Sequence, residues 1–182
     1  MVWNLPNTLT AMRILLIPFF VGFSYLPGRW GFVLAALFFS LAAITDWADG
    51  YIARRRSLLT QFGRFFDPVA DKLLVISALV LLVANGQAPF ILVLIILARE
   101  ITIMALRERM AGLGHRIPVS TTGKWKTGFQ MAAIIMLLVQ TGLWDIPFQI
   151  PGVICLYIST GLTLVSGYHY LKEAWPKLQS GT

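Results

Sequence analysis

Four of the chain's eight acidic residues lie close together in the sequence, beside two strongly hydrophobic segments. They follow the pattern D-x-x-D-G-x-x-A-R, then eight residues, then G-x-x-x-D-x-x-x-D, and they are Asp46, Asp49, Asp67 and Asp71. Ionisable groups at a membrane are costly and usually serve a function. Because neighbouring carboxylates repel and raise one another's pKa, four of them in one gap need one or two divalent cations. The cluster therefore predicts a metal site.

The spacing of each pair places its two carboxylates on one face of a helix. Asp46 and Asp49 are three residues apart, and Asp67 and Asp71 are four apart, which are the spacings of helix neighbours. We expect the first pair to close one helix and the second to open the next, across a polar loop. Ligands that are all oxygen favour Mg²⁺, with Mn²⁺ or Ca²⁺ as alternatives. A simpler interpretation, in which Asp67 caps a helix before Pro68 and the others are solvated charges, explains only Asp67.

Small residues accompany the aspartates at Gly50, Ala53 and Gly63. Small side chains in membrane helices allow the helices to pack closely. They also leave room for a flat group against the backbone, next to the metal. The residues alone support both interpretations.

The composition is that of an integral membrane protein. Hydrophobic residues make up 57% of the 182 and charged residues only 13%, whereas soluble domains carry about 25% charged residues. The mean hydropathy is +0.74. Apolar segments recur far into the C-terminal part, which argues against a cleaved signal peptide. The only cysteine, Cys155, lies in an apolar run and excludes an intramolecular disulfide.

Six hydrophobic segments each come near the length of about 20 residues that crosses a bilayer as a helix. The expected fold class is all-α, a polytopic membrane protein with six transmembrane helices plus a short N-terminal interfacial helix. Residues 1–182 are expected to form a single membrane domain. Its parts are an interfacial segment over 1–10 and spans near 11–27, 31–53, 68–86, 89–107, 125–143 and 148–171.

The distribution of positive charge indicates the orientation. All but one of the 15 lysines and arginines fall near segment ends that share one side, and only Arg29 lies near the other. By the positive-inside rule, both termini and the carboxylate cluster face the cytoplasm. Topology and attraction to anionic membrane phospholipids then explain the net charge of +7, so no nucleic-acid partner is expected.

The aspartate pattern resembles the signature of the CDP-alcohol phosphatidyltransferase family at all of its fixed positions. Further runs resemble the bacterial branch of that family whose acceptor is glycerol 3-phosphate, and they are residues 4–18, 67–72, 98–101 and 123–127. The resemblance implies a phospholipid-synthesising enzyme that transfers the phosphatidyl group of CDP-diacylglycerol to an alcohol and releases CMP. It also implies a homodimer in the bacterial cytoplasmic membrane.

The same resemblance assigns roles to individual residues. The four aspartates would hold two Mg²⁺ ions, and Asp71 would be the catalytic base that accepts the proton of the acceptor hydroxyl. CDP-diacylglycerol would be bound by Asn7, Thr10, Gly50, Ala53, Arg54, Thr60 and Gly63. The fork geometry of Arg54 suits a diphosphate, although an arginine there can also snorkel to the interface. Asn7 is equally a candidate helix cap, and Thr60 an ordinary loop residue.

A phosphorylated acceptor needs cations, and the sequence offers Arg99, Arg107, Lys124 and Lys126. A bare charge such as Arg99 inside an apolar segment costs free energy, and Arg107 lies about two helical turns further along. Arg99 has a competing interpretation as a partner of Glu100, and the two lysines as charges that set the topology.

Several acceptors remain open at this point. A phosphate-binding cluster argues against serine but leaves inositol phosphate as an alternative, and phosphatidylglycerol is a further one. A metal-ion transporter is a remote alternative from another class of protein. It fits poorly because the acidic cluster sits at one end of the helices and not along a path across the bilayer.

Overall fold

The computed structural model of the chain describes residues 5–56, 61–114, 118, 120–139 and 147–179, in which the regular structure is entirely helical. Within these ranges the side chains of 5–11, 13, 29, 46–56, 61–68, 71 and 177–179 lie outside the description. The helices are α1 (Leu5–Ser24), α2 (Arg29–Arg56), α3 (Gln61–Ala84), α4 (Phe90–Gly112), α5 (Thr121–Val139) and α6 (Gln149–Gln179). The predicted all-α class is confirmed.

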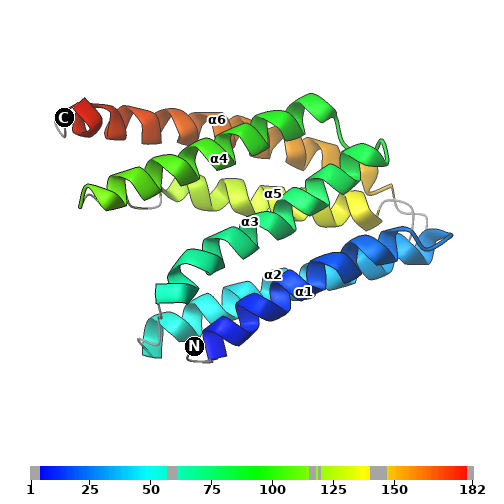
Figure 1. Ribbon diagram of the computed structural model, residues 1–182. Coiled ribbons are helices and arrows are strands. Elements are labelled where there is room, and N and C mark those ends of the chain that lie inside the picture. Colours follow the sequence, from blue (N-terminus) through cyan, green and yellow to red (C-terminus); the bar gives the residue numbers. More distant parts are fainter. Residues whose placement is uncertain (1–4, 57–60, 115–117, 119, 140–146, 180–182) are drawn as a thin grey trace.

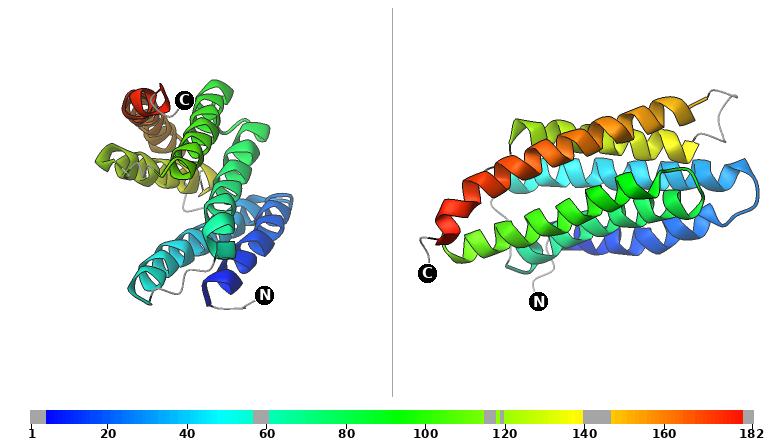
Figure 2. Two further views of the ribbon diagram at one scale, coloured as in Figure 1. Left: turned by 60° about the vertical axis from the view of Figure 1, so that its left-hand side comes forward. Right: turned by 90° about the horizontal axis from the view of Figure 1, so that it is seen from above.

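The helices run up and down in an elongated bundle (Figure 1). α1 and α2 form one antiparallel pair and α5 and α6 another, while α3 packs on α1 and α4 on α6 (Figures 1 and 2). Gly28 (φ 82°) and Gly86 (φ 67°) turn the chain between α1 and α2 and between α3 and α4, with a backbone conformation that favours glycine. The end of α2, the start of α3 and the end of α4 therefore lie at one end of the bundle (Figure 1).

The core lies between these helices. Phe20 of α1 and Phe39 of α2 are fully buried, with ring centroids 6.0 Å apart. Leu79 of α3 and Ile134 of α5 belong to the same buried cluster. Close packing of this kind stabilises a helix bundle even in lipid, where apolar side chains gain nothing by leaving the acyl chains.

Among the described helices, only α6 contains a stretch long and apolar enough to cross a membrane, Gln149–Pro176. Shorter apolar stretches are Ile14–Ser24, Trp30–Thr45 and Lys72–Ala84. Every helix also exposes large apolar side chains on the outside of the bundle, such as Leu15, Trp30, Val80, Phe90, Trp125 and Ile150. The count of six transmembrane helices stays a prediction.

The helices extend beyond the apolar segments at their polar ends. α3 begins at Gln61, so Asp67 and Pro68 lie inside it, and the alternative in which Asp67 caps its N-terminus is wrong. Only residues 57–60 separate α2 from α3, so the connection is shorter than the polar sequence suggested. Hydropathy marks only the apolar part of a helix, whereas extending a formed helix into polar residues is easier than starting a new one.

The N-terminal segment differs in a similar way. Residues 5–10, expected within a separate interfacial segment, form the first turns of α1, which runs unbroken to Ser24. Pro6 permits this because a proline is tolerated in the first helical turn, where its missing N–H would have no helical partner. Asn7 therefore lies within α1 and not at its N-cap.

Gly31 marks a close approach at the turn between α1 and α2. A Cβ on Gly31 would lie 2.7 Å from the carbonyl oxygens of Phe23 and Leu26. Gly31→Ala should therefore destabilise the protein in detergent by about 1–3 kcal/mol, because the backbone has to shift. Gly22→Ala is the control, since a Cβ there meets nothing within 4 Å. Thermal unfolding followed through the thiol of Cys155 measures both, and equal melting temperatures for the two variants would contradict the prediction.

Candidate active site

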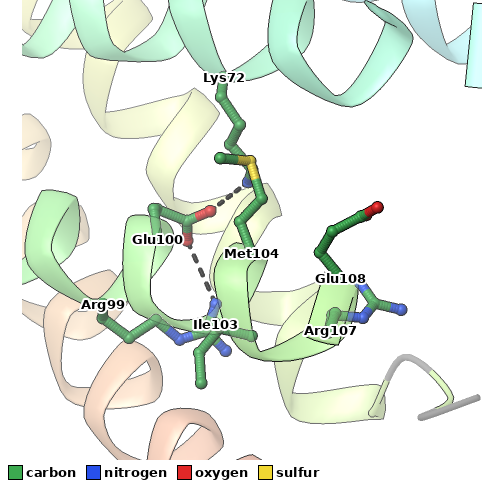
Figure 3. Close-up of a pocket in the computed structure, with 7 residues that line it drawn as sticks. All are labelled: Lys72, Arg99, Glu100, Ile103, Met104, Arg107 and Glu108. Carbon is green, nitrogen blue, oxygen red and sulfur yellow. Dashed lines mark hydrogen bonds and ion pairs between the residues drawn. The ribbon is translucent and has the colours of Figure 1, made fainter. Parts of the chain in front are cut away.

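Glu100 of α4 is the centre of a buried charge cluster. Its side chain is 5% exposed and pairs with cations from three helices. Lys72 of α3 donates a hydrogen bond to Oε2, and Lys126 of α5 donates one to Oε1. The Nη1 atom of Arg99 lies 3.3 Å from Oε1. Figure 3 shows Lys72 and Arg99 reaching the carboxylate from two sides.

This cluster contains more positive than negative charge. Lys126 is 3% exposed, and a buried ammonium without a partner would cost several kcal/mol. Glu100 therefore makes the burial of Lys126 possible, whereas Lys72 keeps contact with solvent. Because one carboxylate faces three cations, the cluster still attracts a further anion.

Arg99 is held on its other side by α6. Its Nη2 donates a hydrogen bond of 2.8 Å to the hydroxyl of Ser166, which donates to the carbonyl of Thr163 over 3.1 Å. A Cβ on Gly167 would lie 3.2 Å from Cγ of Arg99. The glycine thus lets α6 approach the stem of the arginine closely, and the guanidinium is fixed between α4 and α6.

A cavity of about 370 Å³ opens beside the cluster. It is lined by Lys72, Arg99, Glu100, Ile103, Met104, Arg107 and Glu108 (Figure 3). All of these residues except Lys72 belong to α4. Lys72 directly follows Asp71 in α3, so the cavity adjoins the helix that carries the second pair of signature aspartates. Its size and charge suit a small phosphorylated molecule.

The four cations predicted to bind the acceptor differ in where they lie relative to the cavity. Arg99 and Arg107 line the same cavity, as their spacing suggested. Lys126 joins it only through Glu100. Lys124 is exposed and does not line the cavity. The competing interpretation of Arg99 as a partner of Glu100 is confirmed, and it is compatible with anion binding because the guanidinium also faces the cavity.

Sequence reasoning gave no site role to Lys72 or Glu100. From its charge alone, Lys72 is predicted only to set the topology, and Glu100 only to be a possible partner of Arg99. A signal existed for Glu100, because a carboxylate within an apolar helix requires a cationic partner. Which cations would reach it from α3 and α5 depends on the packing of the helices.

The signature aspartates lie in α2 and α3. Asp46 and Asp49 are part of α2, and Asp67 and Asp71 are part of α3, but their side chains lie outside the described residues. The side chains that are described contain no cluster of three or more His, Cys, Asp or Glu. Four carboxylates without nitrogen or sulfur ligands form a donor set that suits Mg²⁺. The arrangement of their oxygens stays a prediction.

The residues predicted to bind the nucleotide fall on three helices. The backbones of Asn7 and Thr10 lie in α1, those of Gly50, Ala53 and Arg54 in α2, and that of Gly63 in α3. Thr60 lies outside the described residues, as do the side chains of the others. The start of α1 and the end of α2 lie at the same end of the bundle (Figure 1), which is the arrangement that a shared nucleotide site requires.

A family model and several known proteins that resemble the chain agree on one family. The family described as CDP-alcohol phosphatidyltransferase matches residues 3–165. The chain is 44% identical to a protein of Pseudomonas fluorescens, over 97% of this chain and 93% of the relative. It is 37% identical to a protein of Bacillus subtilis, over 98% of each. It is 49% identical to a protein of Escherichia coli K12, over 76% of this chain and 78% of the relative.

The chain therefore belongs to the CDP-alcohol phosphatidyltransferase family. The three relatives carry the same name, CDP-diacylglycerol–glycerol-3-phosphate 3-phosphatidyltransferase. All three come from bacteria.

The cluster around Glu100 predicts a specific pattern of stability. Glu100→Gln should lower the free energy of unfolding by about 3–5 kcal/mol, because it leaves the ammonium of Lys126 buried without a counter-charge. The double variant Glu100→Gln/Lys126→Met should recover much of this loss, since neither charge then remains. Glu108→Gln is the matched control, because this exposed glutamate lines the same cavity. Thermal unfolding in detergent measures all three, and a double variant no more stable than Glu100→Gln would refute the prediction.

Proposed function

We propose that this chain transfers the phosphatidyl group of CDP-diacylglycerol to glycerol 3-phosphate, forming phosphatidylglycerophosphate and CMP. The activity follows from relatives that match nearly the whole chain and carry that name. The observation in the structure that supports it is the cationic cavity, which is lined by Arg99, Arg107 and Lys72. Lys72, which lines this cavity, follows Asp71 in α3, and this supports an acceptor site near the signature aspartates.

The signature aspartates would bind Mg²⁺, and the family resemblance implies two ions. When bound, the metal would neutralise the diphosphate of CDP-diacylglycerol and stabilise charge on the phosphoryl group. Asp71 would accept the proton from the attacking hydroxyl of the acceptor. A carboxylate is a weak base, so its contribution depends on holding that hydroxyl at hydrogen-bond distance.

The acceptor phosphate would bind in the cavity on α4. Arg99 and Arg107 present planar guanidinium groups that bind phosphate oxygens in a forked geometry. Lys72 adds a third cation. It pairs with Glu100, and Glu100 also pairs with Lys126 of α5. Lys126 would act through Glu100, and exposed Lys124 would contribute at most to attracting the anion. Inositol phosphate is the alternative acceptor that this charge arrangement also admits.

The nucleotide half of CDP-diacylglycerol would lie between the ends of α1, α2 and α3. Gly50, Ala53 and Gly63 would leave room for it against the backbone, and Arg54 would bind the diphosphate. Asn7, Thr10 and Thr60 would complete the contacts. The diacylglycerol tails would extend along the apolar outside of the bundle into the lipid.

We further propose that the six helices cross the bacterial cytoplasmic membrane, with both termini and the site on the cytoplasmic side. Large apolar side chains are exposed on every helix, which a lipid environment would stabilise and water would not. The distribution of lysine and arginine along the sequence supports the orientation. A homodimer is the expected assembly from the family resemblance.

The acceptor is tested by measuring CMP release. The purified protein with CDP-diacylglycerol and Mg²⁺ should turn over glycerol 3-phosphate, and turn over inositol phosphate, serine or phosphatidylglycerol far more slowly. Asp71→Asn should be slower by a factor of about 10² or more, the usual contribution of a positioned base, whereas Asp145→Asn outside the signature is the matched control. Turnover with another alcohol but not with glycerol 3-phosphate would refute the assignment.

The phosphate pocket is tested by removing its arginines. Arg99→Ala and Arg107→Ala should each raise KM for glycerol 3-phosphate about tenfold or more, since a hydrogen bond to a charged group contributes about 1.5–3 kcal/mol. The KM for CDP-diacylglycerol should change little. Arg109→Ala is the control, because this exposed arginine in the last turn of α4 does not line the cavity. A rise in KM for Arg109→Ala equal to that for Arg107→Ala would place the pocket elsewhere.

A further inference from the structure

Tyr170 of α6 contacts both arginines of the proposed acceptor pocket. The Cζ atom of Arg99 lies 5.5 Å from the centroid of its ring, and that of Arg107 lies 5.8 Å from it. The tyrosine is 5% exposed. A cation within about 6 Å of an aromatic ring is attracted by it, and more strongly where water is excluded. One aromatic side chain therefore interacts with two guanidinium groups.

The contact of both arginines with one ring requires an explanation, because the two arginines are not neighbours on their helix. They are eight residues apart, and an α-helix rises about 12 Å over that distance. Arg99 is held by Glu100 and Ser166, and a second guanidinium nearby is repelled by its charge. The common approach of the two arginines to the Tyr170 ring brings their side chains toward each other along α4, and both arginines line the cavity.

The hydroxyl of Tyr170 has a separate partner. It accepts a hydrogen bond of 3.0 Å from the backbone N–H of Ser120, just before α5 begins. The hydroxyl of Ser120 in turn accepts a hydrogen bond of 3.1 Å from the N–H of Gly123 in the first turn, as an N-cap residue does. The tyrosine thus joins α6 to the start of α5, the helix that carries Lys126.

We propose that Tyr170 is a positioning residue for the acceptor, whose ring orients Arg99 and Arg107 so that both bind the phosphate of glycerol 3-phosphate. This inference rests on the proposed function and on the phosphate pocket. The ring holds the two guanidinium groups in position before the substrate binds, so less side-chain entropy is lost on binding. The hydroxyl serves the stability of α5 and not the binding of the phosphate.

A purely structural role is the alternative. Tyr170 also packs in a small apolar cluster with Ile103, Met110 and Ala174. Packing alone would lower the melting temperature when the ring is removed, without affecting one substrate more than the other. The positioning role predicts instead a change confined to the acceptor.

Two substitutions separate the ring from the hydroxyl. Tyr170→Phe keeps the ring, so KM for glycerol 3-phosphate should stay within about twofold of the wild-type value. Tyr170→Leu removes the ring, so this KM should rise about tenfold, as expected when two cation–ring contacts are lost. The kcat and the KM for CDP-diacylglycerol should stay nearly constant. Tyr168→Leu is the matched control, an exposed tyrosine on the same helix.

A double-mutant comparison tests whether the tyrosine acts through the arginines. In an Arg99→Ala/Arg107→Ala background, adding Tyr170→Leu should raise KM for glycerol 3-phosphate by less than about twofold, because the groups that the ring orients are already absent. A further tenfold rise in this background would overturn the proposal. So would an equal rise for Tyr170→Phe and Tyr170→Leu. If Tyr170→Leu does not fold, Tyr170→Met carries the same expectation with a longer apolar side chain.

The same assays distinguish the possible failures. Absence of wild-type turnover with glycerol 3-phosphate would remove the proposed function itself. Normal KM values for Arg99→Ala and Arg107→Ala in an active enzyme would remove the pocket. An active wild-type enzyme, impaired arginine variants and a normal KM for Tyr170→Leu would overturn only the role of Tyr170.

Discussion

Glu100 is a carboxylate buried among cations, and the geometry of the site depends on it. Lys72, Arg99 and Lys126 come from α3, α4 and α5 and meet at its two oxygens. Close apolar packing stabilises a helix bundle in lipid, but it is not directional. A buried ion pair is directional, and breaking it is costly. The charge cluster therefore helps to fix the relative positions of α3, α4 and α5. Residues of α3 and α4 line the cavity, so its shape depends on the same cluster.

The number and order of the helices could be predicted from the sequence, but their ends could not. Each of the six apolar segments corresponds to one of the six described helices. The polarity of the residues on either side of 57–60 predicts a loop, whereas these residues continue α2 and α3. Hydropathy reports which part of a helix prefers an apolar environment. The backbone hydrogen bonds that define a helix form in polar and apolar segments alike.

The candidate site could be predicted in part. The spacing of Arg99 and Arg107 along one helix predicted that they lie near one face, and both line the cavity. The two lysine partners of Glu100 and the ring of Tyr170 come from other helices, and no local pattern in the sequence predicts which residues meet across a bundle. Lys126 illustrates the limit: its charge suggested contact with phosphate, and its burial against Glu100 gives it a partner within the protein.

The position of Lys72 would influence which acceptors react at the proposed site. Lys72 follows Asp71 in α3 and is paired with Glu100 in α4, so one member of the cation cluster shares a helix with the second aspartate pair. With the acceptor bound as proposed, the separation between its phosphate and its reacting hydroxyl would be set by the packing of α3 against α4. The proposed pocket would therefore select alcohols by the distance between their hydroxyl and their phosphate as well as by charge.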